Sequence, residues 1–138
     1  MASFSPEENT VPIKTDEDVV RLRKLVREEL VALGFSLIEQ TKMVTAASEL
    51  ARNTLRYGGG GRALLENLNE GGRRGLAVSF VDEGPGIVDI AKAMTDGYTT
   101  GGGLGLGLSG AKRLADEFSL ESAPGKGTKV RITKWKLF

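Results

Sequence analysis

The sequence contains neither cysteine nor histidine, and these two absences exclude whole classes of chemistry. Without cysteine there is no disulfide framework and no thiolate zinc site, so the chain is compatible with a reducing compartment. Without histidine, Ser-His-Asp triads, histidine metal sites and a phosphohistidine relay within the chain are excluded. Any chemistry must therefore come from carboxylates, hydroxyls, amides, cations and the backbone.

Long apolar runs and an excess of charge of one sign are also missing. No run approaches the ~20 apolar residues that cross a bilayer. The first residues, MASFSPEENT, lack the basic and apolar regions of a signal peptide. Nineteen basic and eighteen acidic side chains leave a net charge of +1, which provides no field to attract nucleic acid or an anionic membrane. We therefore expect a cytoplasmic protein with neither as a partner.

The length of 138 residues suits one domain, so we expect 1–138 to fold as a unit with a flexible segment at 1–9. Two long helices, a hairpin, a further helix and a second hairpin predict the α+β class. The expected architecture is a two-layer sandwich, with a mixed, mostly antiparallel sheet and helices on one face. The expected strands are 10–14, 62–69, 76–82, 119–122 and 128–134, and the expected helices are 16–33, 36–57, 88–94 and 108–117, the second opened by a Ser36–Glu39 capping box.

Glycine is the compositional outlier, with 19 residues, of which eleven fall between Gly84 and Gly127. Glycines concentrated between well-patterned helices and strands indicate backbone that approaches a ligand. One such stretch, Gly101-Gly-Gly-Leu-Gly-Leu-Gly-Leu108, directly precedes a predicted helix, so its amides and the helix N-terminus could receive phosphate oxygens. The dinucleotide-binding fingerprint is excluded here because no strand precedes the glycines.

Two further clusters carry polar groups of chemical interest. Glu49 and Asn53 lie four residues apart and so share one helix face, where they offer a proton acceptor and an amide oxygen for a hard cation such as Mg²⁺. Asp82 ends a predicted strand and runs into a turn with Gly84 and Gly86, where a flat ring could approach the backbone. Taken singly, a solvated polar pair and an ordinary turn remain the alternative interpretations of these two clusters.

In this order, Glu49-x-x-x-Asn53, Asp82-x-Gly84-x-Gly86, the glycine loop before a helix and Gly127-Thr128 resemble the GHKL superfamily of ATPases and kinases. The resemblance covers about residues 35–135. Ser48-Glu-Leu-Ala-Arg-Asn53 and Arg113-Leu-Ala-Asp-Glu-Phe-Ser-Leu120 are more specifically similar to the serine/threonine switch kinases of bacterial stressosomes, the RsbT type, which are related to anti-sigma factor kinases. The implied fold is the Bergerat fold.

The resemblance implies ATP and Mg²⁺ as cofactors and assigns a role to each motif. Glu49 would be the general base toward the incoming hydroxyl, and Asn53 the Mg²⁺ ligand. Asp82 would accept the adenine amine with help from Thr128. Arg52, Arg56 and Lys112 could contact phosphates or be solvated surface cations. The remaining ATP-binding residues would be Gly84 and Gly86 in the pocket and Gly101, Gly102, Gly103, Leu104, Gly105, Leu106 and Gly107 in the phosphate lid.

The resemblance also implies partners and a regulatory role. The expected substrate is a serine or threonine of a STAS-domain scaffold protein, and the released kinase would activate a PP2C-type phosphatase in the stress response. One alternative is an anti-sigma factor that sequesters a sigma factor and phosphorylates its antagonist. Another is an ATP-binding module without catalytic activity, against which the presence of Glu49 and Asn53 argues.

Overall fold

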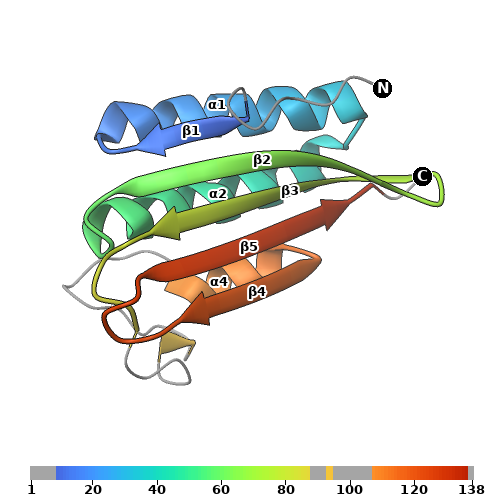
Figure 1. Cartoon of the computed structure of the whole chain (residues 1–138). Coiled ribbons are helices and arrows are strands. Elements are labelled where there is room, and N and C mark those ends of the chain that lie inside the picture. The colour runs from blue at the N-terminus through green and yellow to red at the C-terminus, as the bar shows by residue number, and fades with distance from the viewer. Residues whose placement is uncertain (1–8, 88–92, 95–106, 137–138) are drawn as a thin grey trace.

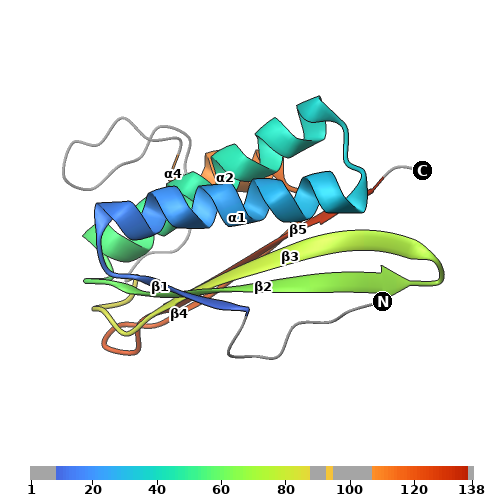
Figure 2. The same ribbon diagram turned by 90° about the horizontal axis from the view of Figure 1, so that it is seen from above.

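The computed structural model describes residues 9–87, 93–94 and 107–136, which form two layers (Figures 1 and 2). The described strands make one sheet in the order β1-β2-β3-β5-β4, and all four neighbouring pairs are antiparallel. The elements are β1 (Thr10–Ile13), α1 (Asp16–Leu33), α2 (Leu37–Arg56), β2 (Gly61–Glu70), β3 (Arg73–Asp82), α4 (Gly107–Leu114), β4 (Glu117–Ser122) and β5 (Thr128–Trp135).

The three described helices cover one face of this sheet, as Figure 2 shows from above. This arrangement confirms the predicted α+β class with helices on one side. The sheet is more regular than the mixed one expected, because every strand pair in the described residues is antiparallel. None of the helices in these residues is long and apolar enough to cross a bilayer.

The core lies between the two layers and is built by the apolar stripes that the sequence predicted. Val19, Leu22, Val26, Leu30 and Leu33 all point inward from α1, at the spacing that places them on one helix face. They meet β-strand residues that alternate toward the helices, such as the buried side chains of Leu76, Val78 and Phe80.

The helix starts follow the predicted capping chemistry with one difference. Thr15 and Asp18 form a complete capping box at the start of α1. At α2 the Ser36 hydroxyl accepts a hydrogen bond from the Glu39 N–H at 3.2 Å. The Glu39 carboxylate instead contacts Lys134 Nζ at 2.7 Å, so it joins the helix to the sheet.

Two boundaries differ from the sequence prediction for physical reasons. Strands β2 and β3 extend to Glu70 and Arg73, because Gly71 and Gly72 both adopt positive φ in the two-residue turn and let the ladder continue to the hairpin end. The helix expected to reach Glu117 stops at Leu114, because Glu117 pairs with Thr133 in the sheet.

The ends of the chain and one predicted helix are only partly covered by the described residues. Of the segment 1–9 that was expected to be flexible, 1–8 lie outside them, and the Asn9 carbonyl accepts a hydrogen bond from the Leu65 N–H at 3.0 Å. Of the helix predicted over 88–94, the described part is Ala93 and Met94.

Asp18 is the one carboxylate in the described residues with a resolved pKa shift. Its pKa lies below the ordinary value of 3.8, first because the carboxylate accepts the Lys14 backbone N–H at 2.8 Å. The Thr15 N–H at 3.1 Å and the paired Arg21 guanidinium lower the pKa further, while burial opposes them. The ionised carboxylate therefore helps to hold the β1–α1 junction.

We expect Asp18→Asn to lower the melting temperature at pH 7. A lowered folded-state pKa stabilises the fold above the unfolded value of 3.8, and this contribution is lost as the pH falls through the folded pKa. The difference between the two proteins should therefore vanish in strong acid, as measured by circular dichroism melts over a pH series. Asp16→Asn, an exposed first-turn acid, is the control. A pH-independent difference would contradict the assignment.

Candidate functional site

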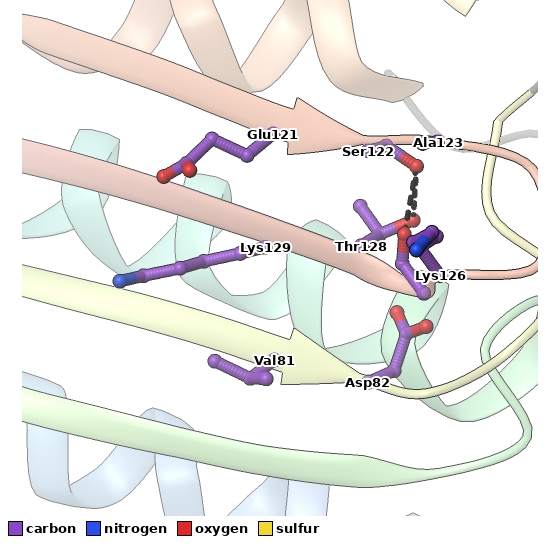
Figure 3. A pocket seen from close by; sticks show the side chains of 9 residues that line it. Val81, Asp82, Glu121, Ser122, Ala123, Lys126, Thr128 and Lys129 are labelled. Carbon is purple, nitrogen blue, oxygen red and sulfur yellow. Dashed lines mark hydrogen bonds between the residues drawn. The ribbon is translucent and has the colours of Figure 1, made fainter.

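Asp82 and Thr128 lie directly opposite each other at the ends of β3 and β5. Both belong to one row across the sheet, in which Gly61 pairs with Asp82 and Ser122 pairs with Thr128. Directly paired residues share a sheet face, and Asp82 is two residues from the buried Phe80, so the row continues the face that the helices cover. The Asp82 carboxylate points toward β5 in Figure 3.

A cavity of about 310 Å³ opens at this end of the sheet. It brings together strand ends that are far apart in sequence, and two of its lining residues, Asp82 and Thr128, are sequence-predicted site residues (Figure 3). The cavity is lined by Val81, Asp82, Glu121, Ser122, Ala123, Lys126, Gly127, Thr128 and Lys129.

The Asp82 carboxylate is half-buried and has one oxygen engaged. Its Oδ1 accepts the Gly84 N–H at 2.9 Å, which turns the chain sharply after the strand. For Oδ2, no hydrogen bond to another described residue is found. Because an ionised carboxylate can only accept, Asp82 offers a hydrogen-bond acceptor to a donor group such as an exocyclic amine.

Glycines allow the backbone segments around Asp82 to approach more closely than other residues would permit. A Cβ on Gly58 would lie 2.3 Å from Asp82 Cγ, and one on Gly84 would lie 2.8 Å from Gly58 Cα. A Cβ on Gly86 would lie 2.0 Å from the Ala123 carbonyl oxygen. The expected role of Gly84 and Gly86 in shaping this region is thus consistent with their packing.

Gly58 and Ser122 belong to the candidate site, although the sequence analysis did not select them. Gly58 was interpreted only as part of a helix stop, although it follows the Glu49–Asn53 helix and contacts Asp82. Ser122 was interpreted only as a strand residue. The one sequence signal for Ser122 was its place at a strand end, six residues before Thr128.

Glu49 and Asn53 lie in the last two turns of α2, one turn apart and about 6 Å along the axis. The Glu49 side chain is 15% exposed, and its Oε1 accepts a hydrogen bond from Arg52 Nη1 at 2.8 Å. The Asn53 carbonyl accepts the N–H groups of Tyr57 and Gly58 at 2.9 and 3.2 Å. The helix end that carries both candidate residues therefore leads straight into the glycine that contacts Asp82.

The predicted phosphate lid is only partly within the described residues. Gly101, Gly102, Gly103, Leu104, Gly105 and Leu106 lie outside them. Gly107 begins α4 with a φ of 70°, α4 packs against α2, and Ala111 of α4 is buried. Helix α4, whose N-terminus follows the predicted lid, therefore packs beside the helix that carries Glu49 and Asn53.

The three candidate phosphate-contacting cations have different surroundings. Arg52 forms an ion pair with Glu49, which orients both side chains on α2. Arg56 and Lys112 are exposed. The alternative interpretation of Arg56 and Lys112 as solvated cations agrees with this exposure, whereas Arg52 has a defined partner.

Metal binding by protein carboxylates alone does not fit the described residues. No group of three or more acidic side chains converges there to hold an ion. Asn53 supplies a hard amide oxygen, and its side chain forms no hydrogen bond with another described residue. This donor fits a Mg²⁺ ion that takes most of its ligands from phosphate oxygens.

The sequence matches one family model over residues 38–137, that of histidine kinase-, DNA gyrase B- and HSP90-like ATPases. The matched region contains Glu49, Asn53, Asp82 and Thr128. The chain belongs to this family. The described two-layer architecture and the predicted GHKL resemblance agree with the match.

Similar proteins of known activity show to which branch of this family the chain is related. The chain is 46% identical over 129 residues to the serine/threonine-protein kinase RsbT of Bacillus subtilis, covering 94% of this chain and 97% of that protein. It is 43% identical over 63 residues to an anti-sigma F factor of Thermoanaerobacter, covering 44% of each chain. The near full-length match makes this chain a serine/threonine-protein kinase family member of the RsbT type.

A solved structure supports the fold. The RsbU and RsbW domains of a Mycobacterium tuberculosis protein match with a TM-score of 0.61 and 20% sequence identity, over 90% of this chain and 30% of that one. At this identity the likeness concerns the fold alone. It agrees with helices packed on one face of an antiparallel sheet.

We expect Gly58→Ala to weaken ATP binding by about ten- to a hundredfold, because overpacking at this contact costs about 1–3 kcal/mol and must displace the Asp82 carboxylate. The measurement is isothermal titration calorimetry with ATP on a protein shown to be folded by circular dichroism.

Gly71→Ala is the matched control for this substitution. Gly71 lies in the distant hairpin turn with a φ of 57°, and nothing lies within 4 Å of an added Cβ. The control should lose about 1 kcal/mol of stability while binding ATP normally. Equal ATP affinities of the wild type and Gly58→Ala would contradict the proposed position of the site.

Proposed function

We propose that this chain transfers the γ-phosphate of ATP to a serine or threonine of a separate STAS-domain protein in the cytoplasm. One observation carries the proposal: the end of α2, with Glu49 and Asn53, meets the Asp82 carboxylate through Gly58. This contact brings the helix end with Glu49 and Asn53 close to Asp82, which supports their proposed roles as proton acceptor, metal-binding amide and base-binding carboxylate. The RsbT relationship supports the same reaction.

Asp82 and Thr128 bind the nucleobase in this proposal. Asp82 Oδ2, which accepts no hydrogen bond from another described residue, accepts an N–H from the exocyclic amine of adenine. Guanine presents a carbonyl at the same ring position, which would leave two acceptors facing each other without a proton. Buried polar groups without partners are costly, so the site favours ATP over GTP.

Glu49 acts as the general base. Its carboxylate is mostly shielded from solvent, and Arg52 holds Oε1 at 2.8 Å, which orients Oε2 for the incoming hydroxyl. A positioned base typically accelerates proton transfer steps by about 10²–10⁴-fold. Phosphoryl transfer otherwise depends mainly on the alignment of the two substrates.

Asn53 would hold Mg²⁺ through its amide oxygen, one helical turn after Glu49. When bound there, Mg²⁺ neutralises negative charge on the phosphates. Gly101 to Gly107, followed by α4, would cover the phosphates with backbone N–H groups, as such loops do before helix N-termini.

The acceptor in this proposal is a serine or threonine of another protein, as the relationship to a serine/threonine kinase suggests. A phosphohistidine within the chain is excluded, because the chain has no histidine. Phosphorylation of the STAS-domain scaffold would release the kinase. The freed kinase would then bind and activate a PP2C-type phosphatase, which makes the chain a partner-switching regulator of a stressosome response.

An anti-sigma factor is the second candidate, favoured by the 43% identity to an anti-sigma F factor. That match covers 44% of this chain, whereas the RsbT match covers 94%, so the kinase of the RsbT type is preferred. Co-purification of the chain with a sigma factor, and not with a STAS-domain scaffold, would favour the alternative.

We expect the wild type to transfer labelled phosphate from ATP to a STAS-domain protein of the same organism, and Glu49→Gln to do so about 10²–10⁴-fold more slowly. ATP affinity should be nearly unchanged, because the base does not hold the nucleotide. Glu28→Gln, an exposed acid on α1, is the control and should react normally. Wild-type transfer rates in Glu49→Gln would show that Glu49 is not the base.

We expect Asp82→Asn to bind ATP about ten- to a hundredfold more weakly. The asparagine has one oxygen to share between the Gly84 N–H and the adenine amine, and its own NH₂ group would face another donor. Calorimetric titration with ATP measures the change. Glu83→Gln, which removes an exposed charge one residue away, should bind like the wild type. Equal affinity in Asp82→Asn would remove Asp82 from the base pocket.

A further inference from the structure

The Ser122 hydroxyl is the meeting point of three hydrogen bonds at the end of β4. Ser122 Oγ accepts the Ile87 N–H at 2.8 Å and donates to the Gly127 carbonyl oxygen at 2.9 Å. Its third partner is Thr128 Oγ1, also at 2.9 Å, and Figure 3 shows the two hydroxyls facing each other. Ser122 thus joins the loop after β3 to both strands of the closing hairpin.

The number of protons available determines the direction of the bond between the two hydroxyls. A serine hydroxyl carries one hydrogen and two lone pairs. The Ile87 N–H can only donate, and the Gly127 carbonyl can only accept, so the Ser122 hydrogen is used by the carbonyl. Thr128 must therefore donate its own hydrogen to Ser122, since two hydroxyls without a shared proton would leave their lone pairs opposed.

This direction leaves Thr128 with only lone pairs for any other partner. Its cross-strand neighbour Asp82 is also an acceptor, and both line the same cavity. The cavity wall formed by these two side chains therefore carries two acceptors and no donor. Such a wall can accept hydrogen bonds from a group with N–H bonds, but it cannot donate one to a carbonyl oxygen.

We propose that Ser122 is a positioning residue that determines nucleobase specificity. By accepting the Thr128 hydrogen, Ser122 keeps the wall formed by Asp82 and Thr128 free of donors, so that this wall binds a purine with an amino group at ring position 6 and rejects one with a carbonyl there. The inference rests on the proposed binding of ATP at this site. It assigns to Ser122 an effect on the choice of base that a purely structural residue would not have.

The test compares ATP with inosine triphosphate, which carries a carbonyl in place of the amino group at position 6. Both are titrated by calorimetry into the wild type, Ser122→Ala and Ser122→Thr. The wild type should prefer ATP, and Ser122→Ala should reduce the preference by about tenfold, the factor expected from one average hydrogen bond, because the Thr128 hydrogen can then turn to the carbonyl. Ser122→Thr retains a hydroxyl and should restore the wild-type ratio.

A double-mutant comparison tests whether Thr128 carries the effect. In a Thr128→Val background, which lacks the hydroxyl, Ser122→Ala should change the ratio of the two affinities no further. If Ser122→Ala fails to fold, Thr128→Val alone serves as the second variant, and its ATP preference should be reduced as well. An unchanged ratio in the folded Thr128→Val protein would overturn the inference.

Two other results would overturn the inference and are distinguishable from failure of the proposed function. A loss of affinity for both nucleotides by the same factor in Ser122→Ala would make Ser122 a structural residue only, while ATP binding stands. Equal binding of ATP and inosine triphosphate by the wild type would also reject the specificity role alone. Failure of the wild type to bind either nucleotide would reject the ATP site itself and the inference with it.

Discussion

The packing of Gly58 against Asp82 is the contact on which the candidate site depends. A Cβ at Gly58 would overlap the carboxylate, and a Cβ at Gly84 would overlap Gly58 itself, so two backbone segments converge where side chains would keep them apart. Because Asn53 lies in the last turn of α2, five residues before Gly58, this contact sets the distance between the base pocket and the groups proposed to act on phosphate.

The opposite end of α2 is attached to the sheet by a different kind of interaction. Lys134 is 4% exposed, and its Nζ contacts Glu39 Oε2 at 2.7 Å, the Leu114 carbonyl at 3.3 Å and Asp116 Oδ1 at 3.4 Å. A buried ammonium with several acceptors is costly to leave without partners, so these contacts specify how α2 and α4 meet β5. With both ends of α2 held, the helix has little freedom to slide along the sheet, and Glu49 and Asn53 stay in place.

The polar groups at the pocket are organised by hydrogen-bond direction as well as by position. Asp82 receives the Gly84 N–H, and Ser122 connects Ile87, Gly127 and Thr128. These contacts use a carboxylate, two hydroxyls and backbone groups, and none of them needs histidine or cysteine. A kinase that depends on alignment and backbone amides can therefore be built without histidine or cysteine.

The sequence alone determined the features that depend on neighbours along the chain. The α1 stripe from Val19 to Leu33, the cap at Thr15 and the α+β class follow from helical spacing and local hydrogen bonding, and the motifs around Glu49, Asn53 and Asp82 indicated the family. The tertiary structure decided that Glu117 joins a strand, that Glu39 meets Lys134 and that Gly58 meets Asp82. It also placed Ser122 against Ile87, 35 residues away along the chain. These contacts depend on how strands and helices pack in space, so they cannot be predicted from the spacing of residues along the chain.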